Sequence, residues 1–199
     1  MFTTMIDHFN KKAANYQSFW QKWPFSALRN SESNTILSLL GNIAGKNIAE
    51  FGCGSGYYTR LLIQKNVTHI WAIDISLDML NNLPTGQITP ILGDASTIQL
   101  NQKFPIIFSA GMLEFTRDPS VVLQNMATHV NPETELILLI PINNLFGKLY
   151  ELFHKIHGIN IHLFALQQFK TMALQANWQI REIIPCGLFS AAIKLTLNN

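Results

Sequence analysis

The amino-acid sequence predicts an α/β fold with a doubly wound, mostly parallel sheet and helices on both of its faces. Three features predict it: β-prone runs alternate with amphipathic helical runs, a glycine-rich turn joins a strand to a helix at 52–56, and the short turn 185–187 joins the last two β-prone runs. Parallel strands need crossover connections, which the alternating helices supply. A short turn instead makes a hairpin, so we expect the last strand to be antiparallel.

Seven β-prone runs are the expected strands, and six helical runs precede or separate them. The strands are expected at 47–51, 69–74, 89–92, 106–109, 135–140, 178–184 and 189–197. The helices are expected at 33–40, 57–64, 77–82, 119–130, 144–156 and 166–176. The sequence has no internal repeat, low-complexity tract or linker, and its 199 residues suit one hydrophobic core. We therefore expect a single domain spanning 1–199.

The glycine-rich turn is the most informative motif of the chain. It reads Glu50-Phe51-Gly52-Cys53-Gly54-Ser55-Gly56 and lies between an apolar run and an amphipathic one. Glycine permits a positive φ and lets a ligand approach the main chain, while the following helix directs its free N–H groups at the turn. The motif predicts a polar or anionic ligand. A tight structural turn is the alternative interpretation of the glycines alone.

Carboxylates at the ends of three expected strands favour a ligand site over a structural turn. Asp74 lies 18 positions after Gly56, close to the offset at which doubly wound folds place an acid for ribose hydroxyls. Glu50 and Asp94 end the first and third strands. With these motifs the chain resembles the class I S-adenosylmethionine-dependent methyltransferases, whose first motif reads acid-x-G-x-G-x-G. The resemblance implies a Rossmann-like, seven-stranded sheet with an antiparallel last strand, and it assigns Asp94 to the adenine amino group.

The resemblance also implies the cofactor, which is S-adenosylmethionine with S-adenosylhomocysteine as its product. Main-chain carbonyls near Ser109 and Ala110 would accept from the cofactor's ammonium group. Tyr16 would reach its carboxylate, and Arg29 is a second candidate for that charge. The expected cofactor-binding residues are Tyr16, Arg29, Glu50, Gly52, Cys53, Gly54, Gly56, Asp74, Ile75, Met79, Asp94, Ala95, Ser109 and Ala110.

Two aromatic-rich segments are expected to enclose the methyl acceptor. Residues 1–30 resemble the lid of small-molecule methyltransferases, and a packed N-terminal helix is the alternative. Residues 143–162 lie where the family varies most and builds its substrate pocket, and an ordinary amphipathic cover helix is the alternative. Their composition predicts a small, apolar or aromatic acceptor.

The sequence assigns no catalytic residue. Glu114 and Phe115 follow the fourth strand where many relatives have a Glu-His pair, so Phe115 removes the usual histidine and argues against a histidine base at that point. His154 or His157 is a candidate base for a phenol or acid hydroxyl. These two histidines lack an Asp, Glu or Cys at ligand spacing, so no metal site is expected.

The aromatic residues Tyr57, Tyr58 and Phe115 are candidates for cation–π contact with the sulfonium. The segment 109–112 lacks the Asn/Asp-Pro-Pro-aromatic element of enzymes that methylate DNA amino groups.

Composition predicts a cytoplasmic protein without a transmembrane segment. The formal net charge of +2 gives no electrostatic reason to expect a nucleic-acid partner. Cys53 and Cys186 are expected to be free thiols of a reducing compartment. No window has the apolar length of a signal peptide or a spanning helix. Nothing in the sequence indicates an oligomeric state.

Two other functions remain open. One is a non-catalytic protein that binds S-adenosylmethionine or S-adenosylhomocysteine as a regulator or partner subunit. The other is a nicotinamide oxidoreductase, which Tyr57 opposes because it occupies the third glycine position of the dinucleotide fingerprint. The terminal hairpin opposes it as well.

Overall fold

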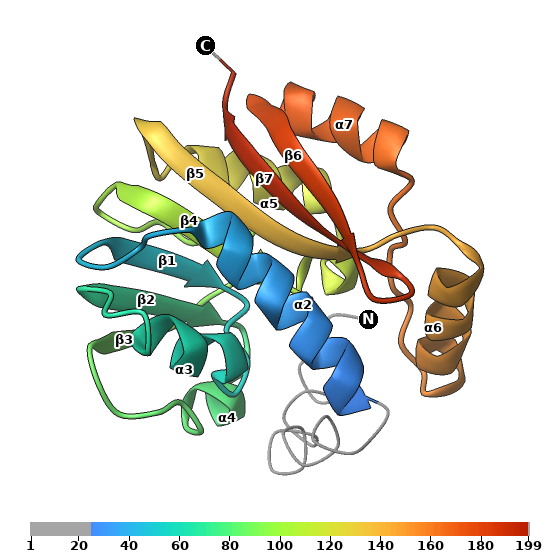
Figure 1. The fold of residues 1–199 in the computed structure, drawn as a ribbon, viewed down its shortest axis with the longest axis horizontal. Helices are drawn as coiled ribbons and strands as arrows, with labels where there is room; N and C mark the ends of the chain where they lie inside the picture. Colours follow the sequence, from blue (N-terminus) through green and yellow to red (C-terminus); the bar gives the residue numbers. More distant parts are fainter. Residues whose placement is uncertain (1–24, 199) are drawn as a thin grey trace.

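The computed structural model describes residues 25–198 and is built around a seven-stranded sheet in the order β3-β2-β1-β4-β5-β7-β6 (Figure 1). The strands are β1 (Asn47–Phe51), β2 (His69–Asp74), β3 (Ile88–Leu92), β4 (Phe104–Ala110), β5 (Val130–Pro141), β6 (Trp178–Cys186) and β7 (Ser190–Leu197). Strands β1 to β5 pair in parallel, whereas β7 pairs antiparallel with both β5 and β6. The predicted doubly wound sheet with an antiparallel last strand is confirmed.

Helices cover both faces of the sheet, as predicted. They are α2 (Phe25–Leu40), α3 (Tyr57–Ile63), α4 (Leu77–Leu80), α5 (Pro119–Ala127), α6 (Leu145–Ile156) and α7 (Leu166–Gln175), with a 3-10 turn η1 (Leu113–Phe115). One buried cluster joins α2 and α3 to one face, and a second joins α5 and α7 to the other. Figure 1 shows the first pair in front of the sheet and the second behind it. Among residues 25–198, no helix has the length and apolar character needed to cross a bilayer.

Two elements, α2 and β5, begin five or more residues earlier than the sequence predicts. Helix α2 was expected from residue 33, because the polar stretch before it hides the helical period, but the structure extends it back to Phe25. Ser33 Oγ donates to the carbonyl of Arg29 within this first part. Strand β5 was expected from residue 135 and begins at Val130, where the polar Thr134 hydroxyl donates to the Phe104 carbonyl of β4. The first residues of β5, whose composition is typical of a turn, are thus held in the sheet by a side-chain hydrogen bond.

The topology determines where a ligand can bind. The chain runs from β1 outward to β3, then returns to add β4 and β5 on the other side of β1. Loops leaving the carboxyl ends of β1 and β4 therefore diverge and leave a crevice between them. The glycine-rich turn follows β1, and η1 follows β4.

Candidate functional site

A cavity of about 480 Å³ lies in this crevice, at the carboxyl ends of β1 to β4. Its volume falls in the range of roughly 300–1,000 Å³ that small-molecule sites occupy. The structure brings ten of the sequence-predicted residues together in its wall: Arg29, Gly52, Cys53, Gly54, Asp74, Ile75, Met79, Asp94, Ala95 and Ala110.

The remaining predicted residues do not line it. Glu50, Gly56 and Ser109 lie outside the wall. Tyr16 and residues 1–24 of the expected lid lie outside the described residues.

The glycines of the turn have different neighbours. All three adopt positive φ, with values of 74° at Gly52, 52° at Gly54 and 82° at Gly56. A Cβ atom on Gly52 would lie 2.3 Å from Cγ of Met112, and one on Gly56 would lie 2.8 Å from Cδ of Pro84. A Cβ on Gly54 would meet no atom within 4 Å. The main chain at Gly54 therefore borders open space in the cavity wall.

Arg60 holds the carbonyl side of the turn. Its guanidinium donates to the carbonyls of Ser55 and Gly56, both at 2.8 Å, and to that of Asn82 at 3.2 Å. The planar guanidinium can reach three acceptors at once because its donors form a fixed fork. Sequence reasoning missed Arg60. The available signal was its spacing, because a residue four positions after Gly56 lies one helical turn further along α3.

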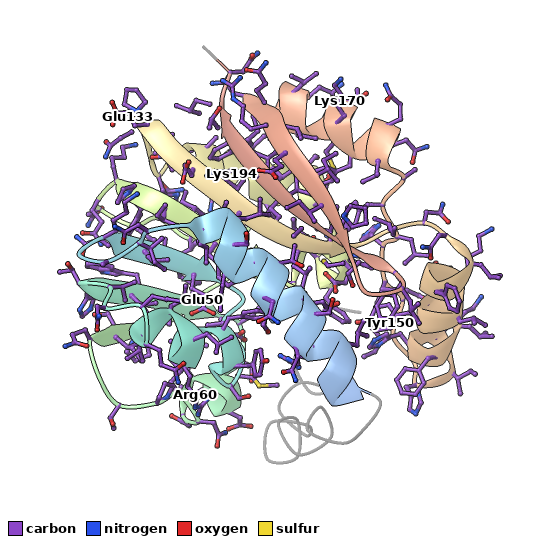
Figure 2. The ribbon with its side chains drawn as sticks, in the orientation of Figure 1. Glu50, Arg60, Glu133, Tyr150, Lys170 and Lys194 are labelled. Atoms are coloured by element: carbon purple, nitrogen blue, oxygen red, sulfur yellow. The ribbon has the colours of Figure 1, made fainter. Side chains whose placement is uncertain are left out.

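Glu50 lies beneath the turn. Glu50 is 2% exposed, and its Oε2 accepts a hydrogen bond of 2.7 Å from Thr59 Oγ1 of α3. Burial raises the pKa of Glu50 to about 8, and the charge of Asp74 acts in the same direction. Figure 2 shows Glu50 inside the molecule near α3. The hydrogen bond between Glu50 and Thr59 therefore joins β1 to α3, the helix that follows the turn.

Asp74 connects the turn to the end of β2. Its Oδ2 accepts the N–H of Gly54 at 2.8 Å, and its Oδ1 accepts the N–H of Ser76 at 2.9 Å. Burial raises the pKa of Asp74, and these backbone hydrogen bonds partly oppose the rise. Each carboxylate oxygen has a second lone pair, so the group retains capacity for hydroxyl donors.

Asp94 ends the third strand region on the same side of the cavity. Its Oδ1 accepts from both N and Oγ of Ser96, at 2.8 and 2.7 Å. Ile75, Met79 and Ala95 add apolar surface to the same wall. The wall thus offers carboxylates for hydroxyl and amino donors together with apolar side chains that can pack on a ring.

The aromatic candidates Tyr57, Tyr58 and Phe115 all line the cavity, and the Arg29 guanidinium lies over two of them. The Arg29 guanidinium carbon lies 4.0 Å from the ring centre of Tyr57 and 5.9 Å from that of Tyr58. Tyr57 Oη also lies 3.0 Å from Ser33 Oγ.

His154 of α6 and His157, which caps the end of this helix, do not line the cavity. His154 is buried edge-on against Tyr150 and Phe115, with ring centres 4.6 and 5.3 Å apart. His157 Nδ1 lies 2.7 Å from the Phe153 carbonyl. Within the described part of the chain, no three His, Cys, Asp or Glu side chains gather where they could hold a metal ion.

Sequence reasoning missed the segment after η1. Thr116, Arg117, Asp118, Val121 and Val122 complete the cavity wall. Asp118 caps α5 by accepting the N–H of Ser120 at 2.9 Å, and Pro119 occupies the first turn. The Asp-Pro pair at the start of the expected helix 119–130 was the available signal.

Comparisons with known proteins agree with this geometry. A family described as "Methyltransferase domain" matches residues 21–183. A tRNA U34 carboxymethyltransferase from Campylobacter concisus is 29% identical over 134 residues, which cover 60% of this chain and 46% of that protein. The chain therefore spans less than half the length of this curated relative.

Solved structures share the fold at low sequence identity. The complex between the Haloferax volcanii Trm112 methyltransferase activator and a methyltransferase gives a TM-score of 0.82 at 13% identity, covering 96% of this chain and 98% of the matched one. Magnesium protoporphyrin IX methyltransferase from Synechocystis PCC 6803, with bound S-adenosylhomocysteine, gives 0.78 at 16% identity, covering 99% and 100%. Because the family match extends over most of the sequence, and the fold agrees with it, the chain belongs to the methyltransferase domain family.

Proposed function

We propose that the protein transfers a methyl group from S-adenosylmethionine to a small, apolar or aromatic molecule. The observation that carries the proposal is the cavity itself: open space above the Gly54 main chain lies between the strand-end acids Asp74 and Asp94. S-adenosylmethionine supplies an electrophilic methyl group on a sulfonium. The protein then needs only to hold donor and acceptor in line and exclude water, which contributes roughly 7–11 kcal/mol toward the barrier.

The donor set of the cavity suits this cofactor. Asp74 would accept from the ribose hydroxyls and Asp94 from the adenine amino group, with Ile75, Met79 and Ala95 against the ring. The Ala110 end of β4 would take the amino-acid end. Arg29 would supply a positive charge for the carboxylate of the cofactor, because the Arg29 guanidinium lies in the cavity wall over Tyr57. Glu50 and Gly56 would act through the turn rather than by touching the ligand.

The acceptor class is inferred from the cavity wall beyond Ala110. Met112, Phe115, Val121 and Val122 give this part apolar surface beside the polar segment 116–118. We further propose one methyltransferase domain spanning 1–199, with residues 1–30 and 143–162 enclosing the acceptor. A tRNA acceptor is the second candidate, because the Campylobacter concisus relative acts on tRNA U34.

A ligand panel tests the cofactor assignment. Ligand that binds only the native state stabilises it by RT ln(1 + [L]/Kd), about 2.7 kcal/mol at a hundredfold excess over Kd. We expect S-adenosylhomocysteine to raise the melting temperature and NAD to leave it unchanged. A shift with NAD alone would overturn the assignment.

Methyl transfer from labelled S-adenosylmethionine then separates an enzyme from a regulator. The acceptors to compare are a set of small phenols, acids and amines, and unmodified tRNA. Labelled small molecules would support the proposal, and labelled tRNA would replace it with the second candidate. Tight S-adenosylhomocysteine binding without transfer to either would favour a regulatory or partner subunit.

A further inference from the structure

A second, smaller cavity of about 70 Å³ lies beside the main one. The two cavities meet along a wall made of five residues that line both: Arg29, Tyr58, Ala110, Gly111 and Phe115. Beyond this wall the small cavity is bordered by α2, the end of β5, α6 and the start of β7, which contribute Glu32, Pro141, Tyr150 and Ser190. Figure 2 shows Tyr150 on the side of α6 that faces the body.

Two buried polar atoms of residues lining the small cavity have no hydrogen-bond partner within the described residues. They are Oε2 of Glu114, a residue 3% exposed, and Oη of Tyr58, a residue 8% exposed. A buried polar group without a partner costs free energy, so such groups are rare in native proteins. A carboxyl oxygen and a hydroxyl left unpaired around one cavity indicate a site for a ligand that carries an N–H or O–H donor.

The main chain holds Glu114 in place. Its carbonyl accepts the N–H of His162 at 2.8 Å, and Thr116 Oγ1 donates to the carbonyl of Leu113 at 2.8 Å. The 3-10 turn η1 follows directly on β4. The main chain that carries the carboxyl is therefore held by the fold, and Oε2 of that carboxyl has no partner among the described residues.

A second carboxyl borders the same space. Glu32 Oε1 accepts a hydrogen bond of 2.5 Å from Ser190 Oγ. Burial raises the pKa of Glu32, and this hydrogen bond and the charge of Arg29 partly oppose the rise. Burial raises the pKa of Glu114 to about 8, and the charge of Glu32 acts in the same direction. An acid or base is most effective when its pKa lies close to the working pH.

We propose that the small cavity receives the proton-bearing oxygen or nitrogen of the methyl acceptor, and that Glu114 takes up its proton. This inference rests on the methyltransferase function proposed above. The acceptor's lone pair bonds to the methyl carbon, the electron pair of the broken S–CH₃ bond stays on sulfur, and the acceptor's proton moves to Oε2 of Glu114. The positive charge on sulfur and the negative charge on the carboxylate disappear together. Tyr58 Oη hydrogen-bonds the same acceptor group.

Sinefungin tests the position of this carboxyl without knowledge of the acceptor. In this cofactor analogue an amine-bearing carbon replaces the sulfonium and its methyl group, so an N–H donor stands at the transfer point. S-adenosylhomocysteine has the same adenosine and amino-acid ends but no such amine. By calorimetry at pH 8.5, above the raised pKa of Glu114, we expect Glu114→Gln to weaken sinefungin about tenfold and to leave S-adenosylhomocysteine within twofold.

Three further variants complete the experiment. Glu133→Gln removes an exposed carboxyl at the opposite end of β5 and is expected to bind both ligands as wild type does (Figure 2). Tyr58→Phe removes only the hydroxyl and should weaken sinefungin roughly threefold, which keeps the proposal testable if Glu114→Gln does not fold. Glu114→Asp should recover part of the lost affinity because it retains a carboxylate.

The outcomes separate this inference from the proposed function. If Glu114→Gln weakens both ligands equally, Glu114 serves the amino-acid end that they share, and the inference is wrong. Unchanged binding of both ligands overturns it as well. A wild-type protein that binds neither ligand contradicts the methyltransferase function itself.

Discussion

At the scale of single residues, two glycines of the turn separate structural from ligand-binding roles. Gly52 and Gly54 both line the cavity and both have positive φ. Only at Gly52 would a methyl group collide with protein, since its Cβ would lie 2.3 Å from Met112 Cγ. At Gly54 the same methyl group would meet no atom within 4 Å.

Gly54→Ala is therefore expected to fold and to lose its ligand. A left-handed alanine costs about 1–2 kcal/mol, but the added methyl group occupies the space in which the cofactor approaches the main chain. Calorimetry should show S-adenosylhomocysteine binding weakened about tenfold or more. Gly52→Ala should instead lower the melting temperature further, because Met112 must move. A Gly54→Ala protein with wild-type affinity would mean that no ligand approaches this point.

The same scale shows what sequence spacing cannot determine. The motif placed Glu50, Asp74 and Asp94 at strand ends, and the structure puts the latter two in the cavity wall. Glu50 points instead toward Thr59 of α3. Side chains alternate between the faces of a strand, so an acid one or two positions from the turn can point either into the crevice or beneath the helix. Spacing alone does not separate these two cases.

At the scale of elements, α6 is the clearest difference between pattern and packing. Leu145, Leu149, Leu152 and Ile156 form an apolar stripe at helical spacing, which ordinarily predicts the buried face. In the structure these residues are more than half exposed, while Gly147 and His154 are buried. Figure 1 shows α6 at the edge of the molecule, beyond the β6–β7 turn. The pattern predicted the helix but not the face that packs.

Strands β1 and β2 were easier to predict because each is a mostly apolar run that lies between two neighbouring strands. Strands β1 and β2 have the predicted bounds, and β3 begins one residue earlier. The turn η1 was not predicted, because three residues carry no periodic signal. Its position depends on contacts with distant segments, such as the hydrogen bond from His162 to Glu114.

Few buried side chains hold α6, so its backbone should open readily in the free protein. We expect the amides of α6 to exchange quickly in the free protein. If residues 143–162 and 1–30 close over the ligand, both segments should become protected when S-adenosylhomocysteine binds. Hydrogen exchange followed by mass spectrometry measures both segments at once. Protection confined to the glycine turn would show that they are fixed packing elements.

At the scale of the whole molecule, burying ionisable groups makes stability depend on pH. Burial raises the pKa of both Glu50 and Glu114 from 4.5 to about 8. Between these values the folded state binds protons that the unfolded state has released. Stability is therefore greatest below pH 4.5 as far as these two groups are concerned, and it is lost as the pH rises toward 8.

Glu50→Gln isolates one of these two protons. Glutamine keeps an oxygen that can accept the Thr59 hydrogen bond but does not titrate, so the variant should gain stability relative to wild type as the pH rises from 5 to 8. The gain approaches about 1.4 kcal/mol per pH unit where the proton difference is complete. Urea unfolding at several pH values measures it, with Glu133→Gln as the exposed control. Parallel stability curves for wild type and Glu50→Gln would mean that Glu50 is already ionised in the folded protein at neutral pH. The carboxylate would then be held beneath the glycine turn as a charge, and the Thr59 hydroxyl would donate its hydrogen bond to a charged acceptor.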